Sequence, residues 1–244
     1  MRNIVVTGGS RGIGLGIAAK LASSGFHVIA LSRSGGEALD AAIRQAAAEE
    51  AGKISFFAQD LSKIEELADA AREIKKRFGS TYGLVNNAGL GTPGMLGNMK
   101  EAEILRLTQL NVTAPLVITK HLMRSMLVAG SGRIVNISSI VALTGYQGIS
   151  AYSATKAAML GFTKSLAREV GGLGITVNAV LPGFTDTEMT GEMDAAARSK
   201  VANRAALKRL TSISDVANMV DYLMSDHASG ITGSSMVVDA GATA

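Results

Sequence analysis

The chain has 244 residues, of which 47% are apolar, and its formal net charge at pH 7 is +4. The absence of cysteine excludes disulfides and thiolate metal sites, and the three histidines are too widely separated to suggest a metal site. The modest charge, with no cluster of basic and aromatic residues, argues against a nucleic-acid partner. No apolar run approaches the roughly 20 residues of a membrane helix, and none at the start resembles a signal peptide, so we expect a cytoplasmic protein with no membrane partner.

Short apolar runs that predict strands alternate with segments that predict helices, which is typical of a parallel sheet covered on both faces. We therefore expect an α/β fold: a Rossmann-type doubly wound parallel sheet of about seven strands, in a single domain over residues 1–244. Ser62 followed by Glu65 predicts a capping box for the third helix. The polar segment 184–209 is expected to form a substrate lid. The expected strands are 4–7, 26–31, 54–57, 83–85, 133–137, 175–181 and 236–238.

A glycine-rich stretch lies between the first expected strand and the first expected helix. It reads Thr7-Gly8-Gly9-Ser10-Arg11-Gly12-Ile13-Gly14. Glycines let the backbone turn tightly and approach a pyrophosphate, and the N-terminus of a helix offers unpaired N–H groups and a partial positive charge. The position between strand and helix predicts a nucleotide site, whereas the same glycines in isolation could form an ordinary turn.

The residues after the second strand distinguish between cofactors. A fold that binds NAD usually places an acid there, about 20 residues after the glycines, to hold the ribose 2′-hydroxyl. This chain has Ser32-Arg33-Ser34 instead, and arginine can pair with a 2′-phosphate but cannot accept the hydroxyl's hydrogen bond. Arg11 can add a second positive charge. We therefore expect NADP(H) rather than NAD, the alternative being that Arg33 is a solvated loop residue.

Tyr152 and Lys156 lie four residues apart in Ala-rich sequence that predicts a helix, so the phenol and the ammonium share one helix face. A nearby cation favours the phenolate, and we expect the pKa of Tyr152 to fall from about 10 toward 7, which requires roughly 4 kcal/mol. Ser138 and Ser139 end the strand 133–137, where ligands bind in open α/β sheets. Taken alone, the Tyr-x-x-x-Lys spacing also fits an ordinary surface pair.

Together these motifs identify the chain as similar to the short-chain dehydrogenase/reductase family over its whole length. Within that family the sequence most resembles the beta-ketoacyl carrier-protein reductases, on residues 161–170 and 174–178. The motif residues that carry the family resemblance are 7–14, Asp60, 86–89, Asn111, Ser139, Tyr152, Lys156, Pro182, Gly183 and Thr187.

The resemblance implies that Tyr152 is the general acid in ketone reduction and the base in alcohol oxidation. It implies that Ser139, rather than Ser138, holds the substrate carbonyl oxygen, and that Lys156 binds the nicotinamide ribose and lowers the pKa of Tyr152. Asn111 would hold a water that joins Lys156 to solvent. The residues assigned to the cofactor, by motif or by resemblance, are Gly8, Ser10, Arg11, Gly12, Ile13, Gly14, Ser32, Arg33, Asp60, Leu61, Asn87, Ala88, Gly89, Tyr152, Lys156, Pro182, Gly183, Thr185 and Thr187.

Pro115 bears on the role of Asn111. If one helix runs through both residues, Pro115 has no N–H to donate to the Asn111 carbonyl, and the freed carbonyl suits a water molecule. Alternatively, Pro115 occupies a first helical turn, where proline is well tolerated. The sequence leaves both alternatives open.

The resemblance predicts a 3-oxoacyl thioester substrate, with acyl carrier protein as a candidate partner. Carrier-protein reductases often have basic residues near the mouth of the site, whereas this chain has Leu173 in that region. Lys120 and Arg124 are candidates to replace those residues, or they form only a solvated helix face. The family also implies a homotetramer, with the helix that carries Tyr152 in the contacts between subunits.

The favoured function is therefore the NADP-dependent reduction of a ketone to a secondary alcohol. A sugar, polyol or hydroxysteroid substrate is the alternative within the same chemistry. A nucleotide-binding sensor without catalysis is a third hypothesis, and the presence of Asn111, Ser139, Tyr152 and Lys156 argues against it, because a sensor needs only the glycine-rich stretch.

Overall fold

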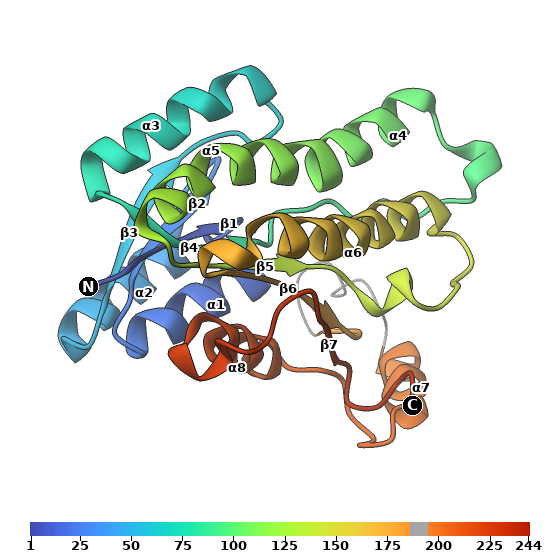
Figure 1. Cartoon of the computed structure of the whole chain (residues 1–244). Coiled ribbons are helices and arrows are strands. Elements are labelled where there is room, and N and C mark those ends of the chain that lie inside the picture. Colours follow the sequence, from blue (N-terminus) through green and yellow to red (C-terminus); the bar gives the residue numbers. More distant parts are fainter. Residues whose placement is uncertain (186–194) are drawn as a thin grey trace.

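The computed structural model describes residues 1–185 and 195–244, and the alternation of strands and helices is clear in Figure 1. The strands are β1 (Asn3–Thr7), β2 (His27–Ser32), β3 (Lys53–Ala58), β4 (Thr81–Asn86), β5 (Gly132–Ile137), β6 (Ile175–Pro182) and β7 (Ser235–Val238). The helices are α1 (Gly12–Ser23), α2 (Glu37–Glu49), α3 (Leu67–Phe78), α4 (Glu101–Thr108), α5 (Ala114–Ala129), α6 (Ser150–Val170), α7 (Ala195–Arg204) and α8 (Ile213–Met224).

The seven strands form one sheet in the order β3-β2-β1-β4-β5-β6-β7, and every neighbouring pair is parallel. The expected doubly wound α/β fold is confirmed. The strand order reverses between β1 and β4, so the connections that leave their carboxyl ends diverge to opposite faces. Ligands bind in the crevice at this point of a doubly wound sheet. The carboxyl ends of β1 and β4 are thus where the site is expected.

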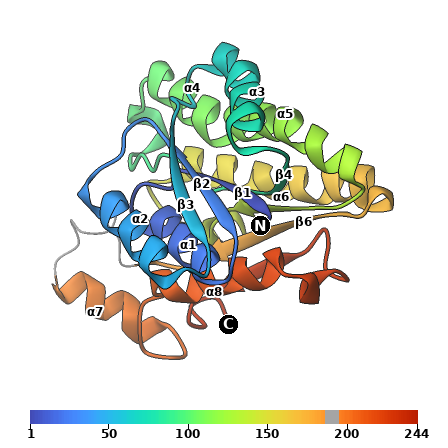
Figure 2. The same ribbon diagram turned by 90° about the vertical axis from the view of Figure 1, so that its left-hand side faces the viewer.

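Two helical layers cover the sheet, with α1, α2 and α8 on one face and α3, α5 and α6 on the other (Figures 1 and 2). Each layer has its own apolar core. On the first face Ile17 and Leu21 of α1 pack with Val216 and Val220 of α8, and all four are fully buried. Because both faces are covered, the strands β1, β4, β5 and β6 are buried almost throughout, as expected for a parallel sheet.

The expected capping box at Ser62 is wrong. The backbone N and Oγ of Ser62 both donate to Oδ1 of Asp60, at 2.9 and 2.8 Å, and the helical turn that follows starts after Lys63 without a side-chain cap. The following residues form a 3₁₀ turn (Ile64–Glu66), and α3 begins at Leu67. The sequence pattern failed because the Asp60 carboxylate accepts the Ser62 N–H that Glu65 would accept in a capping box.

The helices α4 and α5 form one continuous helical stretch, joined by a π-helical turn (Gln109–Thr113) whose last hydrogen bond runs from Ala114 N to the Gln109 carbonyl. Turns of this kind occur frequently at functional sites. No described helix is both long enough and apolar enough to cross a membrane.

Candidate active site

The glycine-rich stretch forms a tight turn between β1 and α1. Gly8 has φ +66° and donates its N–H to the Leu31 carbonyl at 2.7 Å, and Gly12 has φ +53°. A Cβ on Gly12 would meet no atom within 4 Å, so open space lies in front of it. The helix α1 starts there without a side-chain cap and without an acid in its first turn. This geometry can hold a pyrophosphate.

Gly14 has a different role, since it brings α1 against the turn itself. A Cβ on Gly14 would overlap the carbonyl oxygen of Gly8 and would lie 2.5 Å from Nδ2 of Asn87. We expect Gly14→Ala to lower the free energy of unfolding by about 1–3 kcal/mol, because backbone must move to admit the methyl group. Urea unfolding measures this, with Gly230→Ala as the control, because a Cβ there meets nothing. Equal stability of the two variants would contradict this packing.

Thr7 joins the ends of β1 and β4, a role that the sequence did not reveal. Its hydroxyl donates to the Val85 carbonyl and accepts the N–H groups of Asn87 and Ala88 at 2.9 and 3.0 Å. The Asn87 side chain in turn donates to the carbonyls of Thr7 and Gly8, at 2.9 and 3.4 Å. These hydrogen bonds connect the glycine turn after β1 to the predicted cofactor residues Asn87 and Ala88 after β4, on the two sides of the crevice.

The predicted 2′-phosphate site lies at the ends of β2 and β3. The Ser32 hydroxyl donates to the Ser34 carbonyl, which shapes the turn that carries the exposed Arg33. The pKa of Asp60 is lowered by hydrogen bonds from Ser62 and, to a smaller extent, by the charge of Arg33. Leu61, also predicted here, follows Asp60 and is buried in the core.

Tyr152 and Ser139 meet at the carboxyl end of β5. The Ser139 hydroxyl lies close enough to the Tyr152 phenol to lower its pKa, and it accepts the Val141 N–H at 3.3 Å. The neighbouring Ser138 is buried and donates to the Lys156 carbonyl at 2.8 Å. The fold thus directs Ser139 toward the phenol and uses Ser138 to attach α6 to the sheet.

The expected lowering of the tyrosine pKa is not produced by the chain itself. Burial raises the pKa of Tyr152 to about 12, and the polar Ser139 hydroxyl opposes this only in part. Nζ of Lys156 lies 5.6 Å from the centre of the phenol ring and donates to the Ile137 carbonyl at 2.9 Å. Burial also lowers the pKa of Lys156, to about 8. Desolvation destabilises both charged forms, and at this separation it outweighs their attraction.

Asn111 lies in the π-helical turn and is buried. Its side chain is fully engaged: Oδ1 accepts from Leu90 N at 2.8 Å, and Nδ2 donates to the Leu90 carbonyl and to Thr155 at 2.9 and 3.1 Å. Pro115 lies within the continuous helix, and it can donate neither to the Asn111 carbonyl, four residues earlier, nor to the carbonyl five residues earlier. The main-chain carbonyl of Asn111 is therefore the group suited to hold a water.

Gly89 allows the polar groups of this site to approach one another. A Cβ there would lie 3.2 Å from Oδ1 of Asn111 and 3.5 Å from Nζ of Lys156. The structure thus brings Asn111, Lys156 and Gly89 together after the end of β4, beside Tyr152 of α6 and Ser139, which follows β5.

The last group of predicted cofactor residues follows β6. Pro182 ends that strand, Gly183 donates its N–H to the Val238 carbonyl at 2.9 Å, and Thr185 pairs with Thr211 in an isolated bridge. Thr187 lies outside the described residues, as does part of the expected lid at 184–209. The described part of that segment contains α7, so it is not a simple loop.

A cavity of about 390 Å³ lies close to these residues but belongs to another face of α6. Its wall on that helix is formed by Ser150, Ser153, Ala154 and Ala157. At about 100° per residue, Ser153 and Ala157 point roughly 100° to 140° away from Tyr152. The cavity is therefore not the space in which a substrate would meet the phenol.

Comparisons with known proteins identify the family of the chain. The family model for short chain dehydrogenases matches residues 2–198. The chain is 39% identical to the 3-oxoacyl-[acyl-carrier-protein] reductase FabG of Pseudomonas aeruginosa and 38% identical to that of Escherichia coli K12, each over 97% of this chain and 95% of the relative.

Among solved structures, a putative NAD(P)-dependent gluconate 5-dehydrogenase from Beutenbergia cavernae with bound NADP superposes with a TM-score of 0.92 at 31% identity, covering 99% of this chain and 96% of that one. A gluconate 5-dehydrogenase from Burkholderia cenocepacia, in complex with NADP and tartrate, also gives 0.92, at 27% identity and with 99% and 95% covered. The chain belongs to the short-chain dehydrogenase family.

Proposed function

We propose that the protein is an NADP(H)-dependent oxidoreductase that reduces the ketone of a 3-oxoacyl thioester to a secondary alcohol. The observation that carries the proposal is the convergence of Ser139, Tyr152 and Lys156 at the end of β5, beside the glycine turn of β1. The FabG relatives, which match nearly the whole chain, support the substrate class.

The cofactor fits the residues that are present. The open space at Gly12 and the uncapped start of α1 accommodate a pyrophosphate, while Arg33 provides a cation for a 2′-phosphate. NADPH supplies the hydride that reduces the carbonyl carbon. The protein's own contribution is to orient the ketone and to deliver the matching proton.

The Ser139 hydroxyl holds the substrate carbonyl oxygen within reach of the Tyr152 phenol, which donates its proton to that oxygen as the carbonyl carbon is reduced. Because burial raises the pKa of Tyr152 to about 12, the phenol is protonated at neutral pH and ready to act as an acid. The tyrosinate that results lies close to the Lys156 ammonium, which stabilises it. A water on the Asn111 carbonyl connects Lys156 to solvent and restores the proton.

Arg33 is expected to select between the two nicotinamide dinucleotides. Arg33→Asp should raise the KM for NADPH by about 10- to 100-fold, because a charge-assisted pair with the 2′-phosphate is replaced by repulsion. The KM for NADH should change much less, since NADH has no 2′-phosphate. Initial-rate measurements with both cofactors test this, with Arg44→Asp on α2 as the control. An equal change for both cofactors would contradict the role of Arg33.

Substrate class is tested with a panel that covers the relatives and the structural neighbours. The panel contains acetoacetyl-CoA as a CoA thioester, acetoacetyl-acyl carrier protein as a carrier-bound thioester, and gluconate as a sugar acid. The reaction of gluconate is measured as oxidation with NADP⁺. Leu173 is 49% exposed where carrier-protein reductases often have a basic residue, so we expect the CoA thioester to react about as well as the carrier-bound one. Turnover of gluconate in place of both thioesters would refute the proposed substrate.

The homotetramer expected from the family remains part of this proposal, and gel filtration with light scattering tests it.

A further inference from the structure

A buried carboxylate that the proposed mechanism does not use lies next to the loop after β6. Asp239 directly follows β7 and is 8% exposed. Its Oδ1 accepts the Gly241 N–H at 2.8 Å, and its Oδ2 accepts the N–H and the hydroxyl of Thr243 at 2.9 and 2.7 Å. Burial is the largest influence and raises the pKa of Asp239, but the hydrogen bonds from Thr243 and Gly241 outweigh it and leave the pKa below its usual value. An ionised carboxylate thus organises a turn over residues 239–243.

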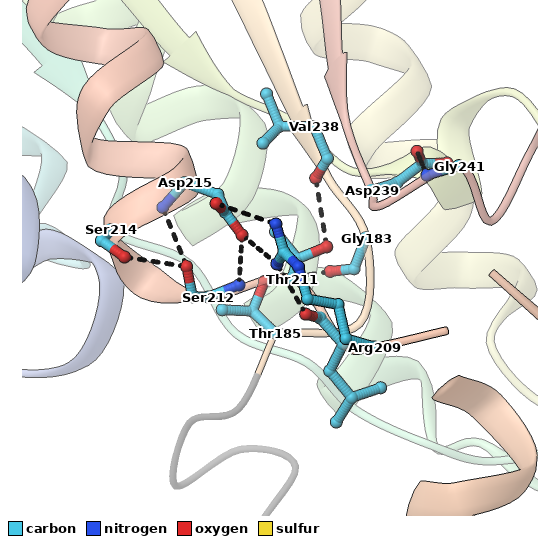
Figure 3. Close-up of polar contacts among 11 residues, drawn as sticks. Gly183, Thr185, Arg209, Thr211, Ser212, Ser214, Asp215, Val238, Asp239 and Gly241 are labelled. Carbon is cyan, nitrogen blue, oxygen red and sulfur yellow. Dashed lines mark hydrogen bonds and ion pairs between the residues drawn. The ribbon is translucent and has the colours of Figure 1, made fainter. Parts of the chain in front are cut away.

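This turn touches the residues that follow β6. A Cβ on Gly183 would lie 2.8 Å from the Cα of Asp239, so the two backbones are in contact. Figure 3 shows Gly183 close to Val238, whose carbonyl accepts the Gly183 N–H at 2.9 Å and the Thr211 hydroxyl at 3.3 Å. The position of Gly183 therefore depends on where the chain turns after β7.

The same turn also holds the chain that follows α7. Ala206 N donates to the Gly241 carbonyl at 3.2 Å, and Leu207 N donates to the Ala240 carbonyl at 3.0 Å. Ala240 has φ +57° and Gly241 has φ +78°. A left-handed conformation is sparsely populated by alanine and persists only where the surroundings hold it. The bonds from the Asp239 carboxylate to residues 241 and 243 provide that constraint.

From these contacts we propose that Asp239 is a positioning residue for the nicotinamide end of the cofactor site. The proposal rests on the proposed function and on the family resemblance, which implies that Pro182 and Gly183 hold the nicotinamide end of the cofactor. The Asp239 carboxylate fixes the conformation of the turn over residues 239–243. That turn positions Gly183 on one side and residues 206–207 on the other. Asp239 itself does not contact the cofactor. The adenosine end, held by the glycine turn and Arg33 at the other end of the crevice, is independent of it.

The test compares two ligands that share the adenosine end. Calorimetric titration measures the Kd of NADPH and of 2′-phospho-ADP-ribose, which lacks the nicotinamide ring. Asp239→Asn, which keeps one acceptor oxygen, and Thr243→Val, which removes one hydrogen bond and keeps the shape, are measured beside wild type. Asp226→Asn is the control, because that carboxylate is 74% exposed and pairs with Arg2 at the surface.

We expect Asp239→Asn to weaken NADPH binding about tenfold, the equivalent of one charge-assisted hydrogen bond, and Thr243→Val to weaken it less. The Kd of 2′-phospho-ADP-ribose should stay within about twofold of wild type in both. Equal losses for the two ligands would show that Asp239 serves only general stability, and unchanged NADPH binding would show that Gly183 is held without it. Either result overturns the inference. Wild-type protein that binds 2′-phospho-ADP-ribose but gains nothing from the nicotinamide half would overturn it as well, while failure to bind either ligand would refute the proposed function itself.

Discussion

Tyr152→Phe is expected to lower kcat for ketone reduction by at least about 100-fold, since positioned proton transfer typically contributes a factor of 10² to 10⁴. The substitution removes one hydroxyl and keeps the aromatic ring of this α6 residue, so the Kd of NADPH should change less than about threefold. Steady-state turnover and fluorescence titration of NADPH measure the two quantities. Tyr222→Phe, at a 45% exposed tyrosine on α8, is the matched control.

The direction of the pH dependence follows from the same phenol. With a pKa raised to about 12 by burial, Tyr152 stays protonated through neutral pH in the protein alone. Reduction needs the protonated form and should therefore lose no activity from this group between about pH 6 and 8, whereas oxidation needs the phenolate and should accelerate as pH rises. Full activity of Tyr152→Phe, or reduction that requires loss of a proton from Tyr152, would contradict the assignment.

Lys156→Met is expected to separate activity from stability. Turnover should fall by about 100-fold or more, because the tyrosinate loses its cation. The free energy of unfolding, by contrast, should not fall. The wild-type chain buries an ammonium whose pKa is lowered to about 8, and that penalty is fully present below this pH. A methionine of similar length carries no charge, so the variant should be at least as stable as wild type at pH 7.

The pH dependence of that difference has a definite sign. Between about pH 8 and the usual lysine value of 10.5, the unfolded wild-type chain binds more protons than the folded one. The free energy of unfolding of wild type relative to Lys156→Met should therefore rise by about 3 kcal/mol over that range. Urea unfolding at several pH values measures it, with the exposed Lys164→Met on the same helix as the control. A difference that stays constant with pH would show that Lys156 is not buried as a charged group.

The sheet could be predicted because each strand is a short apolar run and each is followed by a helix. Parallel pairing follows from this alternation, since the helix returns the chain to the end of the sheet at which the previous strand began. Element boundaries were less accessible: β4 begins at Thr81, two residues before the predicted start, and α3 starts after an additional turn. The start of β4 depends on the pairing of Thr81 with Asn3, which is distant in the sequence. The start of α3 depends on the Asp60 side chain, which takes the Ser62 N–H that the expected capping box requires.

The sequence predicted which side chains lie together at the candidate site, but not their electrostatics. Tyr152, Ser139 and Lys156 are brought together as their motif suggests. The i, i+4 spacing, however, cannot reveal that burial raises the phenol pKa, because desolvation depends on the whole fold. The role of Thr7 was also invisible, since its hydroxyl bonds backbone groups of residues far away in the chain. The Asp239 carboxylate bonds nearby residues, but the contact of Asp239 with Gly183 joins positions that are distant in the sequence.

The measurement that tests the central claim most directly is transfer of label from deuterated NADPH. Purified protein is incubated with acetoacetyl-CoA and NADPH that carries deuterium at C4 of the nicotinamide, on each face in turn, and the product is analysed by mass spectrometry. Hydride transfer to the ketone predicts 3-hydroxybutyryl-CoA with one deuterium on the carbinol carbon from one of the two labelled cofactors. Tyr152→Phe should form at least about 100-fold less of this product over the same time. Absence of product with the wild-type protein, or product without label from either cofactor, would contradict the account.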